Sequence, residues 1–172
     1  MSPNEKVDLV QLQKEIGVWR RHNFPDQLPH QPVLGVAEEI GELMDALLAD
    51  DTGLAQDSIA DITVYALNYC DQRGYPTPIP KYDKGMICSQ ALAVLSSSAG
   101  ALSHAVLKEE QGKRGTALEH QIEGQYALDR LLGAIHAVCT VFRWDFDKIM
   151  TTVWNEVKTR DWVLFPFDGR TR

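Results

Sequence analysis

The chain has 172 residues, a length that suits one domain with its own hydrophobic core, so we treat residues 1–172 as a single domain. Apolar residues make up 44% and charged residues 24%, the composition of an ordinary soluble globular protein. The net charge of −7 argues against nucleic acid as a partner. No run of apolar residues approaches the ~18 of a membrane span, and MSPNEKVDLVQ is no signal peptide, so we expect no membrane partner.

The three cysteines, Cys70, Cys88 and Cys139, lie far apart and have no C-x-x-C spacing. Their number is odd, and each stands in an apolar segment with helical periodicity. We interpret them as reduced thiols in the core of a cytoplasmic protein, because disulfides are rare in that compartment.

Apolar residues recur at spacings of three and four along most of the chain, which predicts amphipathic helices. Pro25, Pro29 and Pro32 are expected to hold the segment after the first helix extended, and 75–85 is expected to be a proline-containing crossover. No strand-like alternation of useful length occurs, so we predict an all-α fold with a four-helix core and flanking N- and C-terminal helices. The expected helices span residues 5–22, 33–50, 54–73, 86–110, 121–143 and 145–160.

The stretch from Val33 to Arg73 combines acidic side chains with apolar helical stripes. Five carboxylates lie at helical spacing within it: Glu38, Glu39, Glu42, Asp57 and Asp61. Like charges at such spacing repel, and each pair weakens an isolated helix by a few tenths of a kcal/mol. Glutamates on a helix usually form a solvated face. Here, however, several carboxylates stand beside the apolar stripe instead of opposite it, which favours a role at a shared site.

A short break at Asp51-Thr52-Gly53 separates the two acidic helices. A connection this tight makes the helices antiparallel neighbours, so their carboxylates can face each other. Two facing acidic surfaces would repel unless a positive charge lay between them. A hard divalent cation prefers carboxylate oxygens, and Mg²⁺ is the usual occupant of such sites.

The motif EEIGEL at residues 38–43, followed after the break by DSIAD at residues 57–61, resembles the signature of the MazG-like nucleotide pyrophosphohydrolases. These belong to the all-α NTP pyrophosphatase group, which also contains the dimeric dUTPases. The family pattern is EExxE, a spacer and ExxD, and Glu39, Glu42 and Asp61 match it. Ser58 stands where the family has a glutamate, and either Asp57 or Glu38 can complete the ligand set.

The resemblance implies Mg²⁺-dependent cleavage of a nucleoside triphosphate to a monophosphate and pyrophosphate, with Mn²⁺ as an alternative cation. It also implies a homo-oligomer, with a dimer as the default. The implied metal ligands are Glu39, Glu42, Asp57 and Asp61. The implied catalytic residues are Glu38, Glu39, Glu42 and Asp61.

Four residues outside the acidic motif are candidates for substrate binding: Trp19, Asn23, Lys158 and Arg160. In the resembled family a Trp and a nearby Asn often precede the acidic motif, and the aromatic ring can stack on a nucleobase; core packing is the alternative for Trp19. The family's final helix supplies Lys and Arg to the phosphates. The alternative for Lys158 and Arg160 is that they complement the helix dipole in a last turn.

Two other functional classes share features with this sequence. A di-iron carboxylate bundle also uses inward glutamates, but it requires Glu-x-x-His pairs, and none of the five histidines has an acidic residue three positions earlier. A non-catalytic helical binding module is the second alternative. It predicts that Mg²⁺ does not stabilise the fold, so a thermal melt with and without the cation separates it from the enzyme.

Overall fold

The computed structural model describes residues 6–82 and 85–170 of the chain. This part folds into helices joined by turns and loops and contains no strand, which confirms the predicted all-α class. The helices are α1 (Leu9–Asn23), α2 (His30–Leu48), α3 (Thr52–Arg73), α4 (Cys88–Gln111), α5 (Ala117–Phe142) and α6 (Phe146–Val157).

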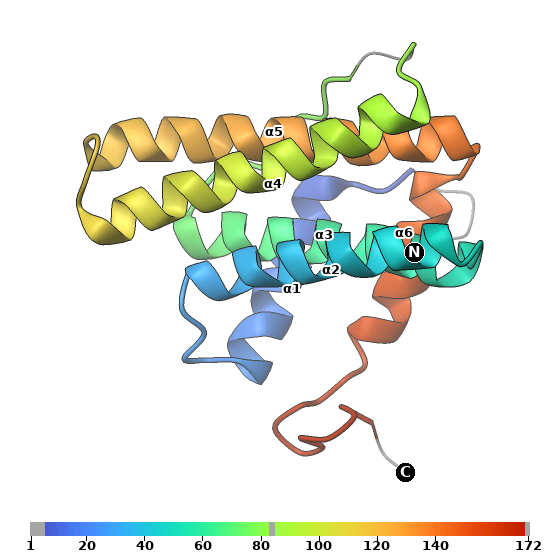
Figure 1. Ribbon diagram of the computed structural model, residues 1–172. Coiled ribbons are helices and arrows are strands. Elements are labelled where there is room, and N and C mark those ends of the chain that lie inside the picture. The colour runs from blue at the N-terminus through green and yellow to red at the C-terminus, as the bar shows by residue number, and fades with distance from the viewer. Residues whose placement is uncertain (1–5, 83–84, 171–172) are drawn as a thin grey trace.

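Two antiparallel helix pairs form the body of the molecule (Figure 1). One pair is α2 and α3, and the other is α4 and α5. The two pairs meet mainly through α2 and α4, and α3 also contacts α5. Helices α1 and α6 both pack against α3, so α3 contacts the acidic partner helix and both terminal helices. Figure 1 shows the C-terminal segment after α6 extending away from the bundle, on the same side as the end of α1.

Local sequence signals account for most helix ends. Asp8, Asp51 and Asp145 each accept a hydrogen bond from a backbone N–H of the first turn and so cap α1, α3 and α6. Gly74 ends α3 in the left-handed conformation, with φ of 64°, and the helix therefore ends at Arg73, the expected boundary. Oγ1 of Thr116 accepts from the backbone N–H of Glu119, and the backbone N–H of Thr116 donates to the Glu119 carboxylate. This capping box makes α5 begin at Ala117, four residues earlier than expected.

Two other boundaries differ from the expectation. Helix α2 begins at His30, so Pro32 lies inside its first turn instead of in an extended segment. A proline is tolerated there because a first-turn N–H has no partner within the helix. Helix α6 ends at Val157, so Lys158 and Arg160 follow the helix and do not form its last turn. Tighter turns follow the helix. In these turns the backbone N–H groups of Thr159 and Arg160 donate to the carbonyls of Glu156 and Val157.

The core lies between the two helix pairs and extends to the inner side of α6. Fully burying a leucine, isoleucine or similar side chain contributes about 1.5–3 kcal/mol. The largest fully buried side chains include Leu43, Ile59, Leu67, Leu95, Leu128 and Trp154. Cys70 and Cys139 are buried free thiols, as expected, whereas Cys88 is only partly buried because α4 begins at that residue.

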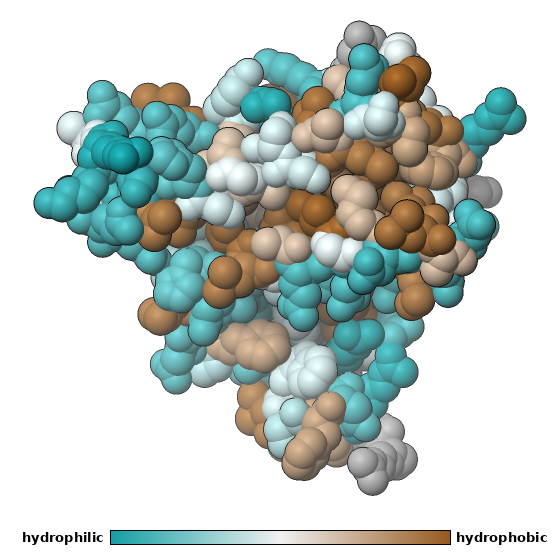
Figure 2. Space-filling view, in the orientation of Figure 1, coloured by the Kyte–Doolittle hydropathy of each residue, from teal (hydrophilic) through white to brown (hydrophobic). Residues whose placement is uncertain are grey.

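Among the described residues, α4 is the one helix whose length and apolar composition would suffice to cross a membrane. A helix in the core of a bundle can be equally long and apolar, because its inward side is packed against other helices. On α4, Leu95 and Leu102 are fully buried in this way. Its outward side carries small residues such as Ala93, Ser97 and Gly100. Figure 2 shows weakly polar and apolar residues over the middle of the view, where α4 crosses the front of the molecule.

Candidate functional site

The α2–α3 pair gathers the five predicted carboxylates into one acidic cluster: Glu38, Glu39, Glu42, Asp57 and Asp61. Burial is the main cause that raises the pKa of Glu39, to about 8. The negative charges of the other four carboxylates raise it further, with Asp61 the largest contributor. Residues from two helices therefore share one electrostatic environment, with Glu39 at its centre.

Asp61 joins this cluster to a positive charge. Burial and the nearby charge of Asp57 raise the pKa of Asp61 to about 6, while the guanidinium of Arg160 acts in the opposite direction. Arg160 comes from the segment after α6, so a third part of the chain reaches the cluster. The guanidinium is held through Nη2 by Glu156 Oε1 at 3.0 Å, and its Nε is buried without a hydrogen-bond partner within the described structure.

The exposure of the carboxylates divides the cluster into fixed and adjustable members. Glu39 and Asp61 are partly buried, whereas Glu38, Glu42 and Asp57 are exposed and free to change rotamer. Among the described residues, no three acidic, imidazole or thiol groups converge into a preformed cage for a metal ion. The donor set fits a hard cation in its chemistry, since it consists of carboxylate oxygens with excess negative charge, and closing around an ion requires rotation of the exposed members.

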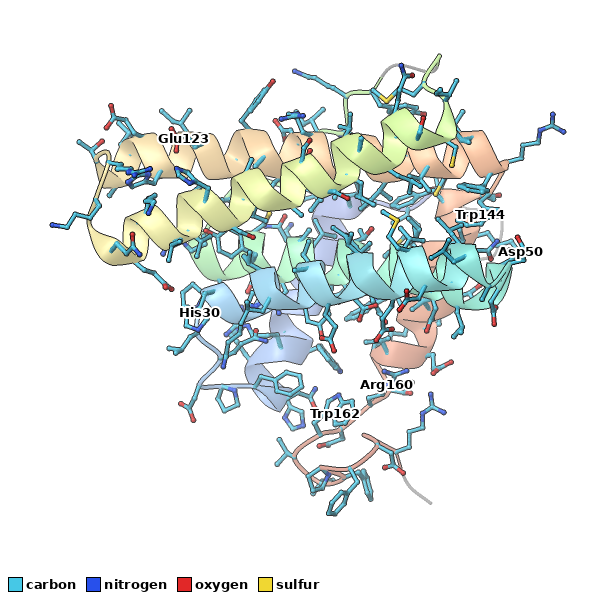
Figure 3. All side chains as sticks on the ribbon, in the orientation of Figure 1. His30, Asp50, Glu123, Trp144, Arg160 and Trp162 are labelled. Carbon is cyan, nitrogen blue, oxygen red and sulfur yellow. The ribbon has the colours of Figure 1, made fainter. Side chains whose placement is uncertain are left out.

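A cavity of about 650 Å³ opens beside the acidic cluster. Glu38, Asp61 and Arg160 line its charged end. Four aromatic side chains line its walls: Trp19, Phe24, Tyr65 and Trp162. Figure 3 shows Arg160 and Trp162 just beyond the end of α6. A cleft with apolar walls and a few convergent polar groups is the usual form of a small-molecule site.

The cavity follows one face of α3. Asp61, Tyr65 and Asn68 are spaced at i, i+4 and i+7, so they form a single row along the helix. With a rise of 1.5 Å per residue, the carboxylate of this row and its amide lie about 10 Å apart along the axis. The cavity is therefore charged at one end, aromatic in the middle and carries amides at the other end, where Gln27 and Gln31 also line it.

Gly35 on α2 lets the ring of Tyr65 lie against the helix backbone. A Cβ atom at position 35 would stand 2.6 Å from Cε1 of that ring, which is closer than any ordinary contact. Burial, followed by the charges of Glu39 and Asp61, raises the pKa of Tyr65 to about 12. The hydroxyl group of Tyr65 is thus protonated at neutral pH and can act as a hydrogen-bond donor.

Trp19 lines the cavity, as the nucleobase prediction requires, and it also packs in the core. Its ring makes edge-to-face contacts with Phe24 and Trp154, with centroid distances of 5.6 and 6.1 Å. Its indole N–H donates to the backbone oxygen of Arg160 at 3.0 Å. The two alternatives for Trp19 are therefore compatible with each other.

Asn23 is buried, and neither end of its amide faces the cavity. Its Nδ2 donates to the carbonyl of Trp19 at 2.9 Å, and its Oδ1 accepts from the backbone N–H of Trp162 at 2.7 Å. The side chain thus fastens the C-terminal segment to the end of α1. Beside this contact, Nε2 of His22 lies 3.1 Å from Oδ2 of Asp161.

The two candidate cations lie in different places. Arg160 lines the cavity next to Asp61. Lys158 lines a separate groove between α1 and α6. In that groove the hydrogen bond from Trp154 lowers the pKa of Glu15, and the positive charge of Lys158 lowers it further. Of the two, only the arginine shares a cavity with the acidic cluster in the described structure.

Several lining residues were not among the sequence candidates. Tyr65 and Asn68 carried a detectable signal, because they continue the helical face of Asp61. Gln27 and Gln31 both lie between Pro25 and Pro32, in a segment with no periodicity. Trp162 had no signal, since tertiary contacts alone place the segment after α6.

No family model, curated protein or solved structure matches the chain. What supports a function is therefore the arrangement of the residues described above, together with the resemblance of the two short acidic motifs. Both point to the same cluster on α2 and α3.

Proposed function

We propose that the protein is a Mg²⁺-dependent nucleoside triphosphate pyrophosphohydrolase of the MazG-like type, converting an NTP or dNTP and water into the monophosphate and pyrophosphate. The observation that carries this proposal is the partly buried Glu39, which belongs to an acidic cluster beside a cavity with aromatic walls. Burial, followed by the charges of four neighbouring carboxylates, raises the pKa of Glu39 to about 8. Such an excess of negative charge suits a site that holds a divalent cation and a polyphosphate.

Four carboxylates would hold the cation: Glu39, Glu42, Asp57 and Asp61. When bound, Mg²⁺ or Mn²⁺ supplies positive charge that polarises the phosphoryl oxygens and lowers the pKa of a nearby water molecule. The exposed ligands, Glu42 and Asp57, can rotate toward the ion, while the partly buried Glu39 and Asp61 keep their positions.

The remaining groups act directly on the substrate and on water. Glu38 lines the cavity and is exposed, so its carboxylate can accept a proton from the attacking water. Arg160 stands next to Asp61 and neutralises negative charge that develops on the departing pyrophosphate. The protonated hydroxyl of Tyr65 donates a hydrogen bond to a phosphate oxygen.

The aromatic walls provide the surface for the nucleoside. Trp19, Phe24 and Trp162 line the cavity together with Arg160, and Phe24 contacts both tryptophan rings. They form one aromatic wall against which a flat base can stack. With the phosphates at the acidic end, the base extends along the row of α3 toward Asn68. Its distal edge then meets the amides, about 10 Å from Asp61 along the helix.

The proposal extends to assembly and location. We take the two helix pairs to be a MazG-like four-helix core, and the protein to be a cytoplasmic homo-oligomer, with a dimer as the default. The buried free thiols Cys70 and Cys139 suit a reducing compartment. Sedimentation of the purified protein measures the oligomeric state directly.

The decisive experiment incubates the protein with a panel of NTPs and dNTPs in the presence of Mg²⁺ or Mn²⁺. Monophosphate and pyrophosphate in equal amounts support the proposal. Orthophosphate alone, or no turnover of any nucleotide, contradicts it. Glu42→Gln removes a ligand and is expected to abolish turnover, whereas Glu123→Gln removes one charge from an exposed position on α5 and serves as the matched control.

A further inference from the structure

The amide end of the cavity presents –NH₂ donors from Gln27 and Gln31, and the orientation of the Gln31 amide is set by a backbone N–H. The Oε1 atom of Gln27 accepts two hydrogen bonds, from Nδ2 of Asn68 at 2.9 Å and from Nε2 of Gln72 at 2.6 Å. Both lone pairs of this oxygen are thereby occupied. The –NH₂ group of Gln27 makes no hydrogen bond within the described part of the chain, and Gln27 lines the cavity. Its two hydrogens are available to a ligand.

Gln31 shows the same polarity, and its amide orientation is set by the backbone. Its Oε1 accepts from the backbone N–H of Leu28 at 2.8 Å. Because a backbone N–H can only donate, the oxygen of Gln31 must face Leu28 and the –NH₂ must face away. Gln31 also lines the cavity, so the two glutamines both present donors at this end.

We propose that the cavity selects nucleotides whose base carries a carbonyl oxygen at its distal edge, namely 6-oxopurines and 4-oxopyrimidines, over adenine and cytosine. This inference rests on the proposed function only in that a nucleotide lies along α3 with its phosphate at the acidic end. An O6 or O4 oxygen accepts hydrogen bonds from Gln27 and Gln31. The 6-amino group of adenine or the 4-amino group of cytosine places donors against donors and leaves them unpaired.

Two other polar side chains line this end. The amide of Asn68 is engaged by its neighbours, because its Nδ2 donates to Gln27 and its Oδ1 accepts from Nε2 of Gln72 at 3.4 Å. Asp26 lines the cavity as an exposed carboxylate, and it can accept from the ring N–H of an oxo base or from an exocyclic amino group alike. Selection therefore depends on the amides. A hydrogen bond between neutral groups corresponds to about a three- to tenfold difference in affinity.

The test measures binding without hydrolysis. Trp19 and Trp162 line the cavity, so titration of the whole protein with nucleoside monophosphates in the presence of Mg²⁺, followed by tryptophan fluorescence, reports occupancy. A monophosphate has no pyrophosphate bond to cleave, so the cation can be present without turnover. The matched ligand pairs are IMP against AMP and UMP against CMP, each differing at the distal edge. We expect IMP and UMP to bind about three- to tenfold more tightly than their partners.

The variant Gln27→Glu sharpens the test. A carboxylate keeps one oxygen for Asn68 and Gln72 and replaces the –NH₂ with an acceptor, so the preference is expected to reverse toward AMP and CMP. Gln121→Glu introduces the same charge on the exposed side of α5 and should leave the preference for IMP and UMP unchanged.

Each result separates the inference from the proposed function. Equal affinity within both ligand pairs, tighter binding of AMP and CMP by the original protein, or a reversal also caused by Gln121→Glu overturns the inference even if triphosphates are hydrolysed. A preference for IMP and UMP without turnover of any triphosphate upholds it while the proposed reaction fails. If no monophosphate binds, the inference is overturned.

Discussion

Trp19 donates a hydrogen bond of 3.0 Å to the backbone carbonyl of Arg160, although 141 positions separate the two residues in the chain. The bond joins the last turn of α1 to the segment that follows α6. It fixes the backbone from which the guanidinium reaches toward Asp61. An aromatic wall of the cavity and the cation of the proposed phosphate site are thus parts of one unit.

The variant Trp19→Phe tests this unit. Phenylalanine keeps an aromatic ring but cannot donate to Arg160, so we expect kcat to fall about tenfold while unfolding costs about 1–2 kcal/mol less. Steady-state kinetics and chemical denaturation measure the two effects. A large rise in KM with unchanged kcat would instead assign Trp19 to base stacking alone.

Alanine substitutions of the two candidate cations, Arg160 and Lys158, should differ sharply in their effect on kcat. Arg160→Ala removes the positive charge beside Asp61 and is expected to lower kcat by about 10²–10³. Lys158→Ala removes a charge from the separate groove between α1 and α6 and should change kcat by less than about threefold. Initial rates of pyrophosphate release compare them, and equal losses would contradict the assignment.

The fourth metal ligand can be identified from Mg²⁺ titrations of two variants. Asp57→Asn is expected to raise the Mg²⁺ concentration for half-maximal rate by at least about tenfold, since it removes a ligand. Glu38→Gln should lower kcat without this shift, because Glu38 is proposed to accept a proton. The reverse pattern would exchange the roles of the two residues.

The raised pKa of Glu39 predicts how the metal-free protein responds to pH. The folded pKa of about 8 lies above the usual value of 4.5, so the contribution of this group to stability is present below pH 4.5 and is lost as the pH rises through 8. In EDTA, Glu39→Gln should therefore melt at a higher temperature than the original protein at pH 9 and show little gain at pH 4. A gain of the same size at both pH values would show that charge is not the cause.

Gly35 provides a steric test of the cavity. Gly35→Ala places a Cβ 2.6 Å from the ring of Tyr65, and the displacement of that ring is expected to cost about 1–3 kcal/mol and to raise KM. Gly100→Ala is the matched control, because a Cβ there meets no heavy atom within 4 Å and a helix-interior alanine stabilises by roughly 0.5–1 kcal/mol. Thermal melts and KM measurements distinguish the two.

Much of the α2–α3 pair was predictable from local pattern. Periodic apolar residues define both helices, Asp51-Thr52-Gly53 forces the reversal, and that reversal brings Glu39 and Asp61 into one cluster. The end of α3 at Gly74 was also predictable, because glycine adopts the left-handed conformation of a helix C-terminus more easily than other residues.

The other half of the site was not predictable in this way. Trp162 is positioned by Asn23, and Arg160 by Trp19, through contacts between opposite ends of the chain that leave no periodic trace. Gln27 and Gln31 both lie between Pro25 and Pro32, in a stretch whose prolines suggested extended chain. Pro32 obscured the true start of α2, because a proline fits a first helical turn as well as it fits a loop.

The attachment of the C-terminal segment through Asn23 separates two tasks that many enzymes combine. The bundle carries the acidic cluster, while Trp162 belongs to a short peripheral segment held by a few polar contacts. Substitutions in that segment can reshape the proposed nucleoside wall without disturbing the packed helices. Under the proposed function, substrate preference can therefore change at little cost in stability, one residue at a time.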